Sequence, residues 1–234
     1  ISFDDDLHNL SLQGPAAVEF LDQHTPYDMN SLKYFHHTQT TLFGHGCMIS
    51  RTGYSGERGY EIFAKADDIV PLWDSIREQG KSVGIIPGSV TCIDMVRVEA
   101  GLFFYPYDMS ENDTPWEVGL GFCVSKKKQG DYRGKSACMS AMGKETTTTV
   151  GVMIDGDTAA EFEADVTVDG NKIGHVTGAC YSTVMEASIC MARVDKKYAE
   201  TGQKLAIKSG DEDLIGTVAT MPLFDPDKMK RSAV

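Results

Sequence analysis

The first part of the chain alternates between strand-like and helix-like spacing of apolar residues. The run LSLQ, residues 10–13, ends at a Gly-Pro turn. The apolar residues that follow, Val18, Phe20 and Leu21, are spaced as in a short amphipathic helix. This order predicts a strand, a tight turn and then a helix.

Two strand-like runs flank a stretch that is rich in glycine and charge. Residues 43–50 and 60–64 are apolar or aromatic, and RTGYSGERGYEIF, residues 51–63, joins them. The pattern predicts a hairpin, and the simplest interpretation is that the glycines take positive-φ turn positions while the charges are solvated. A phosphate-binding loop is disfavoured, because the glycine spacing is not G-x-G-x-x-G and no helix pattern follows.

Two further segments show helical spacing. Residues 67–79 begin with acidic residues and place apolar side chains one turn apart before Gly80. Residues 90–100 carry Ile93 and Val96 on one stripe and stop before a glycine. Acidic first turns and terminal glycines are typical helix boundaries, so both segments are predicted to be amphipathic helices.

A different pattern of residue types begins near Thr146. From there β-branched residues alternate with polar residues and with Asp-Gly and Ser-Gly turn signals, which predicts a small β-barrel or sandwich. A polar stretch with few large apolar residues precedes it. The predicted fold class is therefore α+β, with an α+β domain over residues 1–127, a linker over 128–146 and a β-barrel domain over 147–234.

Composition narrows the classes of partner. The chain has 34 acidic and 22 basic residues and a formal charge of −12, so its average surface repels nucleic acid and anionic lipid. Lys126–Lys128 is the one obvious cationic patch. No segment approaches the roughly 18 unbroken apolar residues of a membrane helix. The six cysteines are widely spaced, as in reduced thiols, and we expect a cytoplasmic protein, or one of the mitochondrial matrix if the source is eukaryotic.

Neither a metal site nor a nucleophilic triad stands out in the sequence. His36, His37 and His45 with Cys47 lack the paired spacing of zinc ligands, and surface or hydrogen-bonded histidines are the favoured interpretation. The acidic run over residues 4–6 is typical of a solvated loop or a helix start. We therefore expect no metal.

Ordered motifs along the whole chain point to a known family. They are LQGPAA (12–17), RTGYSGERGYEIF (51–63), DMVRVEAGLFFYPYDM (94–109), DTPWEVGLGFCV (113–124), DYRGKSA (131–137) and MPLFDPDK (221–228). Together they resemble the folate-binding aminomethyltransferase family of the glycine cleavage T-protein. That family also contains tetrahydrofolate-dependent demethylases and the folate domains of sarcosine and dimethylglycine oxidising enzymes.

The resemblance implies a fold, a cofactor and an activity. The fold would be part of a cloverleaf, in which folate-binding α+β domains and a C-terminal jelly-roll-like β-barrel surround a folate channel. The chain looks like the C-terminal two-thirds of the family, so its first domain would begin inside a longer protein. The family's aspartate at folate N5 would lie upstream of Ile1, which leaves the catalytic residue unassigned.

The implied function is tetrahydrofolate-dependent transfer of a methyl or aminomethyl group. The donor would be a small one-carbon compound, or a lipoyl carrier protein in glycine cleavage. The alternatives are a non-catalytic folate-binding module and the folate domain of a larger N-methyl amine oxidising enzyme. Family membership by itself does not choose among these substrates.

The resemblance also assigns binding residues in the glycine-rich stretch. Glu61 would accept hydrogen bonds from the pterin N–H and amino groups, because a carboxylate offers two parallel acceptors to such a donor pair. Tyr54, Glu57 and Tyr60 would shape the pocket. Arg51 would neutralise Glu57 or Glu61 when the site is empty.

Two positions depart from the T-protein pattern. Ile93 stands where the T-protein has an arginine associated with the glutamate tail of folate, which makes a true aminomethyltransferase less favoured. Phe122 stands in place of a tryptophan and would change the wall of the folate channel.

Without the arginine, recognition of the anionic tail must move elsewhere. One candidate is Arg97, one helical turn beyond Ile93. The other is the C-terminal cluster of Lys228, Lys230 and Arg231. The cluster is favoured, because Arg97 lies within an apolar stripe where a structural ion pair would occupy it.

Overall fold

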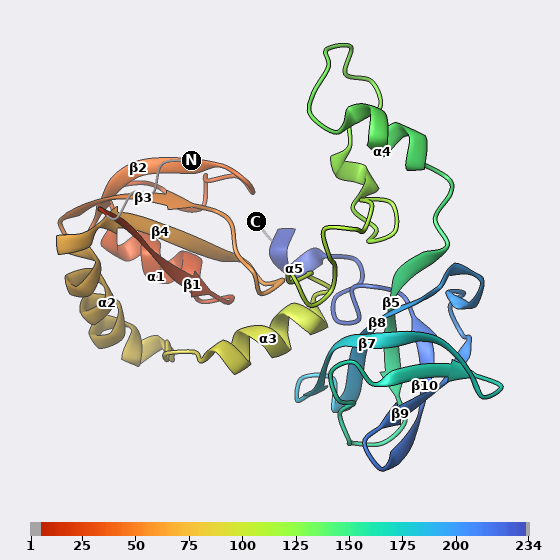
Figure 1. Cartoon of the computed structure of the whole chain (residues 1–234). Coiled ribbons are helices and arrows are strands. Elements are labelled where there is room, and N and C mark those ends of the chain that lie inside the picture. Colours follow the sequence, from red (N-terminus) through yellow and green to blue (C-terminus); the bar gives the residue numbers. More distant parts are fainter. Residues whose placement is uncertain (1–5, 233–234) are drawn as a thin grey trace. The chain divides into compact units, whose positions relative to one another are not determined.

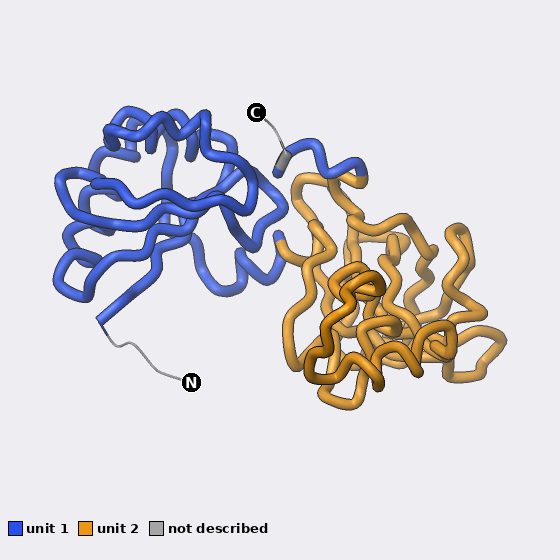
Figure 2. Tube along the Cα trace, turned by 90° about the horizontal axis from the view of Figure 1, so that it is seen from above, with its two compact units in different colours: residues 1–96, 227–234 blue, residues 97–226 orange. Residues whose placement is uncertain are grey.

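The computed structural model describes residues 6–232. They cluster into two compact units, residues 1–96 with 227–234 and residues 97–226 (Figure 2). This division by compactness differs from the division into domains that the sequence pattern suggests, which stays a prediction.

Unit 1 is built on a four-stranded antiparallel sheet with the order β1-β4-β3-β2 (Figure 1). Its strands are β1 (Leu7–Gln13), β2 (His37–Leu42), β3 (His45–Ser50) and β4 (Gly59–Lys65). The predicted hairpin around the glycine-rich stretch is confirmed, because β3 and β4 pair directly, with Ser50 opposite Glu61. Phe43 and Gly44 lie in the turn before β3, so that strand begins two residues later than the pattern indicated.

Helices α1 (Ala17–His24) and α2 (Ala66–Gly80) pack on this sheet and close its core. Leu21 of α1 and Leu72 of α2 are fully buried together with Ile49 and Ile62 of the sheet. Burial of such side chains stabilises a fold by about 1.5–3 kcal/mol each. Both predicted helices are confirmed. The predicted stop at Gly80 is also confirmed, because α2 ends there and the separate short helix η1 (Lys81–Val83) follows.

Helix α3 (Val90–Glu99) is also confirmed, but its predicted apolar stripe is wrong. Ile93 is 44% exposed, whereas Arg97 and Glu99 are buried with Val98. The last turn of α3 buries polar side chains because each finds a hydrogen-bonding partner in unit 2, and Glu99 accepts a bond from Ser182 Oγ at 2.6 Å.

Unit 2 contains a closed antiparallel barrel with the strand order β10-β5-β8-β7-β6-β9. The strands are β5 (Thr147–Ile154), β6 (Asp165–Val168), β7 (Asn171–Ser182), β8 (Ala187–Asp195), β9 (Lys204–Ser209) and β10 (Glu212–Ala219). The predicted Asp-Gly turn joins β6 and β7, where Asp169 and Gly170 both have positive φ, as a type I′ hairpin turn requires. Closure pairs every strand on both sides and removes open edges. The predicted β-barrel is therefore confirmed.

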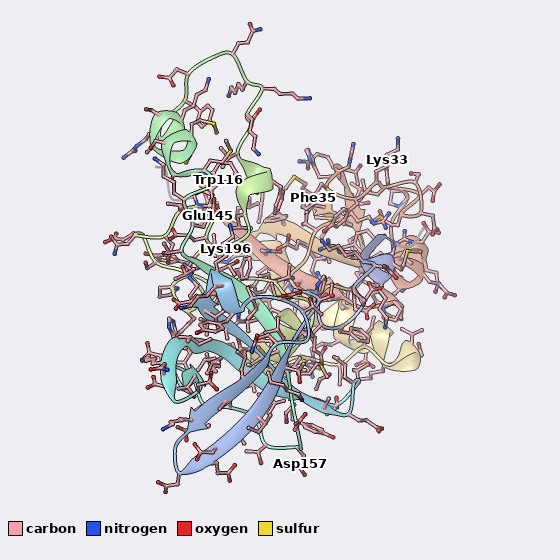
Figure 3. The ribbon with its side chains drawn as sticks, turned by 90° about the vertical axis from the view of Figure 1, so that its right-hand side faces the viewer. Lys33, Phe35, Trp116, Glu145, Asp157 and Lys196 are labelled. Carbon is pink, nitrogen blue, oxygen red and sulfur yellow. The ribbon has the colours of Figure 1, made fainter. Side chains whose placement is uncertain are left out.

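The segment between α3 and the barrel is more ordered than its polar composition suggests. It contains the short helix η2 (Gly121–Cys123) and helix α4 (Lys135–Ala141), which lies inside the predicted linker. Trp116 Nε1 donates to the carbonyl oxygen of Cys138 in α4 at 2.6 Å. Figure 3 labels Trp116 and also Glu145 and Lys196, which form an ion pair of 2.8 Å. The remaining short helices are η3 (Lys196–Tyr198) and α5 (Met229–Ser232).

Candidate functional site

The glycine-rich turn, residues 51–58, connects β3 to β4 and owes its shape to two different properties of glycine. Gly56 has a φ of 75°, in the left-handed region that glycine takes without strain. Gly53 and Gly59 instead leave room for Gln13, because a Cβ at either position would overlap the Gln13 side-chain oxygen. The interpretation that all three glycines serve positive-φ positions is therefore wrong for Gly53 and Gly59.

Gln13, the last residue of β1, ties the two ends of this turn together. Its Nε2 donates to the main-chain oxygen of Tyr60 at 3.2 Å and to that of Thr52 at 3.4 Å. Its Oε1 accepts a hydrogen bond from Ser55 Oγ at 3.0 Å. Sequence reasoning missed Gln13, although it stands next to the Gly-Pro turn in a quoted motif.

Glu61 of β4 is half-buried, and hydrogen-bond donors orient its carboxylate. Asn9 Nδ2 donates to Oε1 at 3.2 Å, and Thr52 Oγ1 donates to Oε2. Thr52 Oγ1 also lies 2.6 Å from Ser50 Oγ. These three neighbours are neutral, and each carboxylate oxygen has two lone pairs. The carboxylate can therefore accept further hydrogen bonds from a ligand that presents two parallel N–H groups.

Lys230 of the C-terminal helix α5 reaches the glycine-rich turn. Its Nζ lies 3.2 Å from Glu57 Oε1, and both side chains are partly exposed. A pair of this kind contributes at most about 1 kcal/mol and weakens with salt. Arg51 Nη2 donates to the carbonyl oxygen of Arg231 at 3.4 Å, so a second contact holds α5 at the same turn. The structure thus brings the predicted C-terminal cluster to the predicted turn.

Tyr60 and the two arginines of the turn lie inside unit 1. Tyr60 has no exposed surface, and its hydroxyl donates to the carbonyl oxygen of Met29 at 3.4 Å. Arg51 and Arg58 are 6% and 5% exposed. Arg51 Nη1 donates to the carbonyl oxygen of Leu32 at 3.1 Å. The interpretation that the charges of this stretch are solvated is therefore wrong for both arginines.

Strand alternation explains why neighbouring residues differ so much. Successive side chains of β4 point to opposite faces of the sheet, so Tyr60 and Ile62 enter the core while Glu61 faces away from it. Tyr60 therefore serves as a core residue that also holds Arg58, through a hydrogen bond from Arg58 Nε at 3.1 Å. Tyr54 is half-buried on the turn.

Arg97 forms a buried ion pair in unit 2, with Asp108 as its partner. Arg97 is 3% exposed and Asp108 is 2% exposed. Asp108 also accepts hydrogen bonds from Thr177 Oγ1 at 2.5 Å and from the Phe104 N–H at 2.7 Å. Structural pairing of Arg97 was anticipated, but Asp108 and Thr177 were missed. The remaining predicted residue of this unit, Phe122, is 83% exposed in η2.

The predicted binding residues thus fall into two groups. Unit 1 contains Arg51, Tyr54, Glu57, Tyr60, Glu61, Lys228 and Lys230, and unit 2 contains Arg97 and Phe122. Within unit 1, the contacts described above link Glu57 to Lys230 and Glu61 to Thr52. Asn9, Gln13 and Thr52 are the residues that sequence reasoning did not name.

Two of the buried thiols, Cys47 and Cys190, are unreactive. All six cysteines are free. Burial raises the pKa of Cys47 to about 11, partly opposed by a hydrogen bond with the Leu42 backbone, and burial together with Cys180 raises the pKa of Cys190 to about 12. Both thiols therefore stay protonated and unreactive near neutral pH.

The described part of the chain, residues 6–232, lacks a metal-binding cluster and a helix that could span a membrane. Within that range no group of three or more His, Cys, Asp and Glu side chains could hold a metal ion. Asp4 and Asp5 of the acidic run lie outside the described residues. None of the helices in the described part of the chain is long and apolar enough to span a bilayer.

Comparison with known families decides the identity of this fold. Residues 1–128 match the family model described as the GCVT N-terminal domain, and residues 148–225 match the glycine cleavage T-protein C-terminal barrel domain. The chain belongs to the glycine cleavage T-protein family. The resemblance seen in the sequence motifs is thereby confirmed.

Relatives of this T-protein family chain include a demethylase subunit and aminomethyltransferases. It is 47% identical over 242 residues to the heme-dependent oxidative N-demethylase gamma subunit of Ectopseudomonas mendocina, covering 100% of this chain and 64% of that relative. It is 36% identical over 206 residues to an aminomethyltransferase of Alkaliphilus metalliredigens, covering 86% of this chain and 55% of that relative. The chain therefore spans less than two thirds of the length of either relative.

A solved structure confirms the fold. The aminomethyltransferase T of the glycine cleavage system from Bartonella henselae matches with a TM-score of 0.72 and 16% identity. The match covers 94% of this chain and 84% of that chain. The predicted α+β class of the T-protein family, with a C-terminal barrel, is therefore confirmed.

Proposed function

We propose that this T-protein family chain binds tetrahydrofolate through Glu61 and serves in the transfer of a one-carbon unit to it, as one component of a larger N-demethylating assembly. The observation that carries the proposal is the half-buried Glu61 carboxylate, which two neutral donors orient. The 47% identity over the full chain to a demethylase gamma subunit favours the assembly.

The residues around Glu61 fit the pterin end of a reduced folate. A pterin presents a ring N–H and an amino group side by side, and a carboxylate accepts both in parallel. Asn9 and Thr52 leave Glu61 with free lone pairs, because each oxygen needs only one of its two for them. Tetrahydrofolate, when bound, supplies the amine nitrogen atoms that capture carbon at the oxidation level of formaldehyde.

The contribution of this chain is positioning. Asn9 and Thr52 fix the Glu61 carboxylate before a ligand arrives, so little orientational freedom is lost on binding. Gln13 holds the glycine-rich turn beside it through bonds to Thr52 and Tyr60. A cofactor held in a fixed orientation beside a demethylating centre would receive the one-carbon unit before it escapes to water.

We assign the glutamate tail of the cofactor to Lys228 and Lys230. Lys230 reaches Glu57 in the glycine-rich turn, which places a partly exposed positive charge near the proposed site in unit 1. Arg97, the competing candidate, is occupied by its buried pair with Asp108. Ile93, at the position of the usual tail-binding arginine, is partly exposed and carries no charge.

A second candidate function is aminomethyl transfer from a lipoyl carrier protein. It is favoured by the 36% identity to an aminomethyltransferase. The departure at Ile93 weighs against it, and the lower identity makes it the weaker of the two. Both candidates require the same folate site, so the test of Glu61 applies to both.

Glu61→Gln is expected to weaken tetrahydrofolate binding by about 1–3 kcal/mol, the usual contribution of charge-assisted hydrogen bonds. Calorimetric titration of the wild-type and variant proteins with tetrahydrofolate measures the difference. Glu78→Gln is the matched control, because Glu78 is an exposed glutamate of α2 that pairs only with nearby helix residues. Equal affinity of the Glu61→Gln variant and the wild-type protein would remove Glu61 from the site.

A further inference from the structure

Arg58, the last residue of the glycine-rich turn, is a buried cation without a counter-charge among the described residues. It is 5% exposed. Its Nε donates to the Tyr60 hydroxyl at 3.1 Å. Over residues 6–232, its Nη2 is buried with no hydrogen-bond partner, and none of the ion pairs includes Arg58. Buried charges are costly unless they are paired, so this arrangement calls for an anion.

A second buried guanidinium group, that of Arg51, adds to the positive charge beside Arg58 and so favours a bound anion. Arg51 is 6% exposed, and burial together with the nearby charge of Arg58 lowers its pKa. Neither guanidinium group can relieve this repulsion by losing a proton near neutral pH, because arginine stays protonated in proteins. A bound negative charge at Arg58 would stabilise both side chains.

The backbone beside these arginines is strained. Phe35 has a φ of 60°, an uncommon conformation for a bulky residue, and its side chain is 73% exposed. The Phe35 N–H donates to the carbonyl oxygen of Arg51 at 3.1 Å. Phe35 and Lys33 lie on the same surface loop as Leu32, whose carbonyl oxygen binds Arg51 (Figure 3). Strain of this kind clusters at binding sites.

We infer that the guanidinium group of Arg58 is a carboxylate-binding site, separate from the Glu61 carboxylate and from the proposed folate function. A carboxylate fits better than a phosphate, because its single negative charge balances the single charge of Arg58. The carbonyl oxygen of Met29, bonded to the same Tyr60 hydroxyl as Arg58, would add repulsion against a dianion. A planar carboxylate matches the fork of N–H groups that arginine presents. The carboxylate comes either from a free small acid or from an acidic side chain of another protein.

The test is the thermal unfolding of the full chain in sodium formate and in sodium chloride at equal concentration. A ligand that binds only the folded state raises the unfolding midpoint. We expect formate to raise the midpoint of the wild-type protein by about 3 °C or more relative to chloride, and Arg58→Gln to lose most of this response. Arg77→Gln is the matched control, because Arg77 is an exposed arginine of α2, and it should respond like the wild-type protein.

Equal responses of the wild-type, Arg58→Gln and Arg77→Gln proteins would overturn the inference. If Arg58→Gln does not fold, Arg58→Lys replaces it, since lysine keeps the charge but lacks the fork. Its formate response should be reduced about threefold or more, and an unchanged response overturns the inference. Acetate and N-acetylglutamate amide then separate the two sources, because a larger response to the capped glutamate assigns the site to a protein side chain and a larger response to acetate assigns it to a small acid.

Discussion

Replacing Asp108 by asparagine is expected to lower the free energy of unfolding by about 3–5 kcal/mol, the usual cost of breaking a buried ion pair from one side. Asparagine keeps the shape of the side chain but removes the charge that balances Arg97 in the interior. It also leaves Thr177 Oγ1 and the Phe104 N–H with a weaker acceptor. Urea unfolding followed by circular dichroism measures the change.

The control for Asp108 is Asp213→Asn on β10, an exposed position in the same unit. Substitutions of that kind usually change stability by no more than about 0.5 kcal/mol. A loss of less than about 1 kcal/mol in Asp108→Asn would mean that the pair with Arg97 does little to hold unit 2 together. Arg97 would then again be a candidate for binding the glutamate tail of folate.

Tyr60→Ala is expected to cost about 3–5 kcal/mol of stability, as large-to-small changes at buried aromatic residues do. Tyr60 has no exposed surface and packs in the core of unit 1. Tyr60→Phe removes only the hydroxyl that binds Met29 and Arg58. It should cost about 1–3 kcal/mol, because the buried Arg58 Nε loses its acceptor. Chemical unfolding of both variants separates the packing contribution from the hydrogen bonds.

The Tyr60→Phe variant also shows whether Tyr60 is a core residue or a pocket residue. If Tyr60 belongs to the core, Tyr60→Phe keeps the tetrahydrofolate affinity of the wild-type protein. A large loss of affinity with unchanged stability would place the hydroxyl in the binding pocket instead. Calorimetric titration of the folded Tyr60→Phe protein gives the answer.

Local patterns in the sequence were enough to predict most of the fold. The strand, turn and helix around the first Gly-Pro pair, the β3–β4 hairpin and the Asp-Gly turn of the barrel all depend on residues close together in sequence. Helix α3 shows the limit of this reasoning. Its existence follows from local spacing, but its buried face is set by polar partners in unit 2, such as the Ser182 hydroxyl that binds Glu99.

The contacts of the buried Arg97–Asp108 pair and of the candidate site at Glu61 join distant parts of the chain. Thr177 lies 69 residues from Asp108, and Asn9 lies 52 residues from Glu61, so no local pattern predicts either contact. The register of the β1–β4 pairing would have predicted that Asn9 lies close to Glu61. Ser11 stands opposite Glu61 in the β1–β4 pairing, and a residue two positions along β1 lies diagonally across on the same face.

The most direct test of the central claim follows the transferred carbon. N-methyl amines labelled with ¹³C in the methyl group are given to the protein, together with the chains that co-purify with it and with tetrahydrofolate. Dioxygen is present as the two-electron oxidant that takes the methyl carbon to the level of formaldehyde. NMR then records where the label goes. The account predicts that the label reaches tetrahydrofolate faster with the protein than it does when free labelled formaldehyde reacts with tetrahydrofolate in the absence of protein. It also predicts that Glu61→Gln slows the transfer. Release of the label as free formaldehyde, at the same rate with the wild-type and Glu61→Gln proteins, would contradict it.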